Sequence, residues 1–309
     1  MEDLKNLKKI DIHVHASAFP QYAPLTESGE PDPRLVSPDV LLEMYDRLGI
    51  EKGVLLAMTS PEAVFSPTTS EMCKYMADQH PDRLAWFCSV DPRAVADMAE
   101  SNLAKVIMHY KSLGAKGVGE VTAHMYLDDP KVDNLFSACE ACDMPVILHL
   151  THRMTRGYGL YDDFGLPRLE KALQNHPNLK IFGHSQMFWA AISGDLKEEE
   201  RGGNPKGPVT EGGRVVELLR KYPNLYCDLS AGSGANAMMR DPDFTEKFIE
   251  EFSDRLLYGT DIVYTTNEHP FQFRDFLEKM LDEGRISPEN YRKIVRDNAI
   301  RILNRSFIL

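Results

Sequence analysis

The stretch KIDIHVH, residues 9–15, predicts a short buried β-strand that carries two histidines. Its three β-branched apolar residues are of the kind that strands favour. Side chains alternate between two faces along a strand, so His13 and His15 would point in the same direction from its C-terminal end. Two imidazoles placed in this way can bind one divalent cation from one side. In the structural alternative, one histidine packs in the core and the other lies in a loop. The rest of the chain decides between these two interpretations.

A helix and then a buried strand follow, and this unit repeats. Residues 40–48 carry apolar side chains at helical spacing, and the continuous apolar run 53–58 predicts a strand that is buried on both faces. The further strands are expected at 84–90, 117–121, 146–150, 180–183, 225–229 and 256–259. The further helices are expected at 68–79, 94–113, 131–143, 165–175, 212–222, 242–253, 270–283 and 288–304.

Eight strands alternating with helices predict an α/β fold, a closed (β/α)₈ TIM barrel that forms a single domain over residues 1–309. An open doubly wound sheet would instead need a glycine-rich turn after the first strand, where this chain has His-Val-His-Ala-Ser. The connection 185–213, after the sixth strand, is much longer than the others, and we interpret it as an insertion. Its Phe188 and Trp189 would form an apolar wall facing the pocket, and the charged segment after them would form a mobile cover.

Composition excludes several classes of partner. The 309 residues are 43% hydrophobic and carry a net charge of −12 without a long basic run, which argues against nucleic acid or an anionic membrane as partner. The first residues lack the apolar region of a signal peptide, and no stretch approaches the length of a membrane span. The five cysteines are an odd number, and we expect reduced thiols in a cytoplasmic protein.

Potential metal ligands occur at the ends of five predicted strands. In a barrel of this class the carboxyl ends of the strands surround the active site, so these side chains would converge. Neutral imidazoles and carboxylates without cysteine suit a catalytic site for zinc, manganese or iron. Taken alone, each has a structural alternative, such as a buried ion pair or a turn cap. The candidates are His13, His15, Glu120, His149, His184 and Asp261.

Residues that follow the strands could border the pocket. Arg153 and Arg240 are candidates to bind a substrate carboxylate, although surface ion pairing is the alternative for each. His152, Phe188 and Trp189 complete the predicted substrate-binding set.

The motifs IDIHVH, the histidines His149 and His184, and the sequence Gly-Thr-Asp ending at Asp261 resemble the amidohydrolase superfamily. More narrowly, they resemble its amidohydrolase-related branch, which includes aminocarboxymuconate semialdehyde decarboxylase and lactone hydrolases. The C-terminal stretch YRKIVRDNAIRILN, 291–304, is similar to the closing helix of that branch. The resemblance extends over essentially the whole chain.

The resemblance implies roles for individual residues. His13, His15, His149 and Asp261 would be metal ligands, and His184 would be a ligand or an acid/base group. A glutamate on strand four, the position of Glu120, is a ligand in the related metal-dependent deoxyribonucleases, which hold two metals. The decarboxylases hold one metal, so the number of metals stays open.

We therefore expect a metal-dependent hydrolase of a small ester, lactone or amide, in which a divalent metal, zinc before manganese or iron, activates water. Asp261 would be the general base, and His184 would stabilise the oxyanion or assist proton transfer. The alternative is non-oxidative decarboxylation of an aromatic or muconate-like acid, and a third possibility is a binding protein without chemistry. The expected partner is a small-molecule substrate, and assembly as a homodimer is left open.

Overall fold

A computed structural model describes residues 4–22, 35–63, 68–155 and 157–303. Its strands run parallel in two hydrogen-bonded groups. The first group consists of β1 (Lys9–Val14), β2 (Ile50–Leu56) and β3 (Leu84–Phe87). The second follows the path β4 (Val118–Val121), β5 (Val146–Thr151), β7 (Ile181–His184), β8 (Leu225–Asp228) and β9 (Leu256–Leu257), and the short β6 (Leu160–Tyr161) pairs with β5 beside that path.

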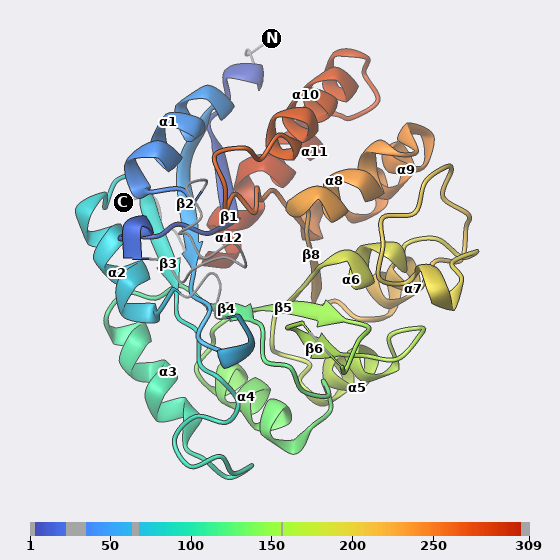
Figure 1. Cartoon of the computed structure of the whole chain (residues 1–309). Coiled ribbons are helices and arrows are strands. Elements are labelled where there is room, and N and C mark those ends of the chain that lie inside the picture. The colour runs from blue at the N-terminus through green and yellow to red at the C-terminus, as the bar shows by residue number, and fades with distance from the viewer. Residues whose placement is uncertain (1–3, 23–34, 64–67, 156, 304–309) are drawn as a thin grey trace.

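Two parallel bridges close these groups into a barrel. Cys88, just after β3, pairs with Val118 of β4, and Val14 of β1 pairs with Ile262 beyond β9. The backbone N–H of Ile12 also donates to the carbonyl of Tyr258 at 3.1 Å. Eight strands therefore form a closed ring with the helices outside it, which confirms the predicted (β/α)₈ fold (Figure 1).

The helices largely follow the predicted ranges. They are α1 (Pro38–Leu48), α2 (Ser70–Gln79), α3 (Leu103–Ser112), α4 (Pro130–Ala141), α5 (Pro167–Asn175), α6 (Gln186–Ala190), α7 (Arg214–Lys221), α8 (Ala231–Met239), α9 (Pro242–Phe252), α10 (His269–Asp282), α11 (Pro288–Arg292) and α12 (Asn298–Leu303). A π-helical segment, Lys293–Asp297, joins the last two. None of the helices in the described part of the chain is long and apolar enough to cross a membrane.

Local sequence explains where α1 begins and ends. The Ser37 hydroxyl accepts the backbone N–H of Val40, and Pro38 occupies the first turn, where its missing N–H is not needed. The helix ends at Gly49, which adopts a left-handed conformation with φ 72°.

The prediction of one helix over 94–113 is wrong in its first half. Helix α3 begins only at Leu103, because the Asn102 side chain caps it by accepting the N–H of Lys105 at 3.1 Å. Upstream, Val95 and Asp97 have φ of 74° and 53°, values that interrupt a right-handed helix.

The segment 185–213 connects β7 to α7. It contains α6 and a short 3-10 turn, Glu198–Glu200, and extends outward from the barrel near α7 and α9 (yellow in Figure 1). Its two arms are tied together, since the N–H of Gly194 donates to the carbonyl of Thr210 at 2.9 Å. The predicted cover over the barrel mouth remains a prediction.

Gly183 of β7 allows α6 to pack closely against the barrel. A Cβ at Gly183 would lie 2.3 Å from Cε2 of the buried Phe188 ring. Overpacking of this kind costs about 1–3 kcal/mol, so we expect Gly183→Ala to lower the free energy of unfolding by that amount in chemical denaturation. Gly232→Ala in α8 is the matched control, because no described atom lies within 4 Å of its Cβ position. Equal stability of the two variants would contradict this packing.

Candidate metal centre

Four side chains bring ligand atoms together at the C-terminal end of the barrel. His13 Nε2 and His15 Nε2 lie 3.1 Å apart, and Asp261 Oδ1 lies 3.4 Å from each of them. Glu120 Oε2 lies 3.4 Å from His15 Nε2 and 3.8 Å from His13 Nε2. Ligands that are each about 2.1 Å from one ion lie roughly 3.0–3.4 Å apart at adjacent coordination positions. The spacing of the His13, His15 and Asp261 atoms therefore fits a single divalent ion between them, and Glu120 lies beside that ion position.

The burial of this cluster supports the same conclusion. His13, His15 and Glu120 are buried, and only the Asp261 side chain retains notable exposure, 23%. Burial would raise the pKa of Glu120, but the neighbouring histidines, His149 foremost, hold it well below the usual range of a glutamate, so the carboxylate is ionised. Buried carboxylates are costly without a compensating cation. A divalent metal fits this donor set.

Asp228, at the end of β8, holds two histidines at once. Its Oδ2 lies 2.6 Å from His13 Nδ1 and 3.0 Å from His184 Nδ1, and it accepts a 2.9 Å hydrogen bond from the Ser230 hydroxyl. A histidine that binds metal through Nε2 commonly donates its Nδ1–H to a carboxylate in this way. Although burial opposes it, the two histidines hold the pKa of Asp228 well below its usual range. Asp228 therefore fixes the direction in which His13 and His184 present Nε2.

Asp228 is a site residue that was not predicted from the sequence, although the strand-end criterion could have found it. The residue lies in the predicted strand 225–229 one position before the predicted end, the same position that Glu120 and His149 occupy in their predicted strands. His15 has a different support, since its Nδ1 lies 3.3 Å from the backbone carbonyl of Leu56.

His184 lies on the far side of the carboxylates. Its Nε2 is 3.7 Å from Glu120 Oε1 and 3.9 Å from Asp261 Oδ2. With His13 and Glu120, it forms a second group of atoms close enough to share an ion. This position is compatible with either of the two predicted roles, ligand or acid/base group.

His149 contacts a candidate ligand. Its Nδ1 lies 2.6 Å from Glu120 Oε1, and its ring packs against Tyr158 with 4.6 Å between ring centroids. In the described part of the chain, His149 belongs to neither group of ligand atoms that could share an ion. Direct metal binding by His149 stays a prediction, and its observed contact orients Glu120.

A cavity of about 180 Å³ opens beside the cluster. It is lined by His15, Met58, Glu62, Ala63, Glu120, His149, Tyr158, Asp261, Val263 and Tyr264. Glu62 is held in place by Arg93, whose two Nη atoms donate to its two carboxylate oxygens at 2.8 and 2.9 Å. Most of the additional residues come from loops, where no periodic pattern marks them.

The expectation that Phe188 and Trp189 face the pocket is wrong. Both are buried in the apolar core, and neither lines the described cavity. The physical reason is that Gly183 leaves room for the Phe188 ring, while the Trp189 indole N–H donates to the backbone carbonyl of Asp228 at 3.0 Å. The Trp189 hydrogen bond fixes the backbone of Asp228, whose side chain contacts His13 and His184.

The three polar candidates for substrate binding also lie outside the lining of this cavity. Arg153 Nε contacts His152 Nε2 at 2.9 Å, and the side chain of Arg153 is exposed. Arg240 follows the C-terminal end of α8, where its Nε and Nη2 are buried without a partner among the described residues. Contact of any of the three with a substrate stays a prediction.

Comparison with known families places this site in context. The chain matches the amidohydrolase family model over residues 10–305. It belongs to the amidohydrolase family. As an amidohydrolase, the chain is an enzyme. No curated protein matches its sequence.

Solved structures similar to this amidohydrolase have low sequence identity and the same fold. One is a probable 2-pyrone-4,6-dicarboxylic acid hydrolase from Acinetobacter baumannii with citric acid bound, 16% identical, with a TM-score of 0.60, covering 96% of this chain and 99% of that one. Another is 2,6-dihydroxybenzoate decarboxylase from Rhizobium, 18% identical, with a TM-score of 0.55, covering 96% and 98%. A third, dihydroxybenzoic acid decarboxylase from Polaromonas sp. JS666 with bound manganese and 2-nitroresorcinol, is 16% identical, with a TM-score of 0.52, covering 96% of each chain.

Proposed function

We propose that this amidohydrolase hydrolyses a small ester, lactone or amide with the help of a divalent metal. The observation that carries the proposal is the position of Asp261. Its Oδ1 belongs to the ligand cluster, while the same carboxylate lines the adjacent cavity. One carboxylate thus reaches both the ion and the space in which water and a substrate carbonyl would meet.

A bound divalent metal would supply a Lewis acid that makes water more acidic and polarises a carbonyl group. His13, His15, Glu120 and Asp261 are the residues proposed to hold it. Zinc is the ion we propose for this nitrogen and oxygen set, and the manganese in the Polaromonas relative supports manganese as the second candidate.

The side chains have separate proposed tasks. Asp261 accepts a proton from the attacking water and returns it to the leaving group. His184 faces Asp228 through Nδ1, and its Nε2 lies 3.9 Å from Asp261 Oδ2. In its protonated form, His184 is positioned to donate a hydrogen bond from Nε2 to the developing oxyanion. Glu120 remains ionised beside the histidines and adds a base or ligand oxygen near the water.

The second candidate function is non-oxidative decarboxylation, which the names of two similar structures favour. The charge of the cavity favours hydrolysis. Glu120 and Asp261 contribute carboxylates to its wall, in addition to Glu62, whose charge is paired with Arg93. Like charges at close range oppose the entry of an acidic substrate. Of the described residues that line it, none is a lysine or arginine.

Glu120→Gln tests the choice between the two reactions, because it keeps the shape of the side chain and removes its charge. Purified enzyme is screened against lactones, esters, amides and aromatic acids, with carbon dioxide release recorded separately. We expect turnover of the ester or lactone substrate to fall at least about 100-fold in the variant. The exposed Glu199→Gln is the control for loss of a carboxylate. Carbon dioxide release from an aromatic acid that persists undiminished in Glu120→Gln would favour decarboxylation.

We further propose that a small-molecule substrate is the working partner, without nucleic acid or membrane, and that the enzyme acts in the cytoplasm as one domain. The five cysteines support the cytoplasmic location, since all of them are free and buried. A homodimer remains compatible with this proposal.

A further inference from the structure

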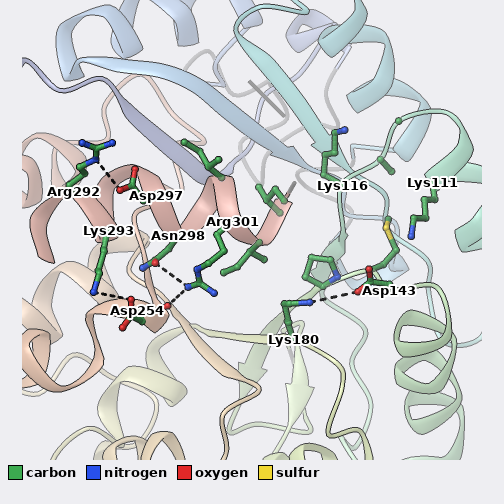
Figure 2. Close-up of a pocket in the computed structure, with 17 residues that line it drawn as sticks. Lys111, Lys116, Asp143, Lys180, Asp254, Arg292, Lys293, Asp297, Asn298 and Arg301 are labelled. Atoms are coloured by element: carbon green, nitrogen blue, oxygen red, sulfur yellow. Dashed lines mark hydrogen bonds and ion pairs between the residues drawn. The ribbon is translucent and has the colours of Figure 1, made fainter. Parts of the chain in front are cut away.

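The two ends of the barrel differ in how their polar side chains are connected. A cavity of about 1030 Å³ lies at the N-terminal ends of the strands, where Lys180 lines it just before β7 (Figure 2). Its charged side chains face separate protein partners, since Lys180 points to Asp143 and Lys293 points to Asp254 (Figure 2). At the carboxyl ends, by contrast, one network of hydrogen bonds joins β5, β7 and β8 beside the metal centre.

Ser185, the residue directly after His184 of β7, has a backbone conformation that is rare for serine. Its φ of 97° and ψ of 170° lie in a region that is essentially restricted to glycine. Such a conformation costs free energy and persists only where the surrounding structure holds it. Ser185 is buried, so packing and hydrogen bonds inside the protein must hold it.

The Ser185 hydroxyl makes one of these hydrogen bonds. It donates to the backbone carbonyl of Leu150 at 2.7 Å, and it does not cap α6. Strands β5 and β7 are paired up to His149 and His184, the last pair in their register. The hydroxyl therefore joins the two strands one residue beyond the point where their backbone pairing ends.

The backbone of Ser185 leads to a second partner of His184. The Ser185 carbonyl accepts the N–H of Trp189 at 3.1 Å, in the first turn of α6. The Trp189 indole N–H donates to the backbone carbonyl of Asp228 at 3.0 Å, and the Asp228 carboxylate lies 3.0 Å from His184 Nδ1. These contacts form a closed circuit that starts at Ser185 and returns to the ring of the preceding residue.

Ser185 acts on the site through His184 rather than on a ligand. It is not among the described residues that line the cavity beside the metal centre. The His184 ring lies 4.5 Å from the His13 ring between centroids, and its Nε2 lies 3.9 Å from Asp261 Oδ2. A displacement of about 1 Å of a group in such a site can lower a reaction rate about 100-fold.

We propose that Ser185 is a positioning residue, whose hydrogen bond to Leu150 holds the backbone that aims His184 Nε2 at the metal centre. This inference rests on the proposed function, in which His184 donates a hydrogen bond to the developing oxyanion. The unfavourable backbone conformation is retained because it sets the direction of the His184 side chain.

Ser185→Gly and Ser185→Ala separate positioning from stability. Both variants lose the hydroxyl, but only glycine adopts a φ near 97° without strain. We expect a higher melting temperature for Ser185→Gly than for Ser185→Ala, the reverse of the usual order of these two residues. Both variants are expected to lower kcat at least about tenfold, with KM and metal content unchanged. A purely structural role would instead restore kcat in the more stable glycine variant.

Ser193→Ala is the matched control for loss of a buried hydroxyl in the same 185–213 segment. The Ser193 hydroxyl donates to Asp195 Oδ1 at 2.6 Å, but none of the described contacts joins Ser193 to His184. This variant is expected to retain the wild-type kcat.

Crystal structures of the wild-type enzyme and of Ser185→Gly give a readout that does not depend on the reaction. The distance from His184 Nδ1 to Asp228 Oδ2, 3.0 Å in the wild-type chain, is expected to exceed about 3.5 Å in the variant. An unchanged distance, wild-type kcat in Ser185→Gly, or a lower melting temperature than that of Ser185→Ala would overturn the positioning role. If the wild-type enzyme hydrolysed none of the screened substrates while the distance lengthened in the variant, the proposed function would fail and the positioning role would stand.

Discussion

Asp261→Asn is expected to lower kcat/KM of this amidohydrolase by about 100- to 10,000-fold, the range that loss of a positioned general base produces. The variant keeps the size of the side chain but loses the charge and the proton acceptor. Asp261 also contributes an oxygen 3.4 Å from both His13 Nε2 and His15 Nε2, so part of the loss will come from weaker metal binding. Activity is measured at saturating metal to separate the two contributions.

The matched control for Asp261→Asn is Asp78→Asn on α2, an exposed aspartate paired only with Lys74 at 2.6 Å among the described residues. Its activity should equal that of the wild-type enzyme. If Asp261→Asn kept more than a tenth of the wild-type kcat/KM at saturating metal, that result would contradict a general-base role for Asp261.

Asp228→Asn is expected to weaken metal binding by about 10- to 100-fold, the effect usual for a partner that orients a ligating histidine. The Asp228 carboxylate accepts from His13 Nδ1 at 2.6 Å and His184 Nδ1 at 3.0 Å. An asparagine can offer only one acceptor oxygen, and its amide N–H groups would face ring N–H groups. Chelator competition gives the metal affinity of each variant.

Ser230→Ala provides the comparison for this prediction. The Ser230 hydroxyl donates to Asp228 Oδ2 at 2.9 Å and also lies 3.2 Å from His13 Nδ1. It therefore belongs to the same hydrogen-bond network as Asp228 but carries no charge. We expect a change in metal affinity below about tenfold for this variant. Equal affinities of Asp228→Asn and wild type, with both folded, would show that Asp228 has no positioning role.

The barrel could be predicted because its signals are local. Continuous apolar runs mark strands buried on both faces, and residues such as Ser37 and Gly49 mark the ends of a helix. The error at 94–113 has the same origin: apolar spacing continues upstream of Asn102, but a side-chain cap and two residues with positive φ prevent the helix from beginning earlier.

The candidate ligands were found for an equally simple reason. The ends of parallel strands meet at one edge of the barrel, so His13, Glu120 and Asp261 are brought together by topology alone. The finer arrangement of these side chains depends on differences of about an ångström in the positions of their atoms. Sequence spacing does not reveal that the His149 ring contacts Glu120 and that Asp228 joins two histidines.

The walls of the pocket could not be predicted from the sequence. Glu62, Tyr158 and Tyr264 reach the cavity from loops, whose paths are set by packing and hydrogen bonds far along the chain. Phe188 and Trp189 follow a strand end, where pocket residues are expected, but both pack into the core. Gly183 leaves the room that the Phe188 ring occupies there.

The most direct test of the central claim is the anomalous difference density of a zinc-loaded crystal, recorded at the zinc absorption edge. We expect a peak bonded to His13 Nε2 and His15 Nε2 at roughly 2.0–2.1 Å, with an Asp261 or Glu120 oxygen at roughly 2.0–2.2 Å. A peak elsewhere, or none at this cluster after incubation with excess zinc and with manganese, would contradict the metal-dependent mechanism proposed for this enzyme.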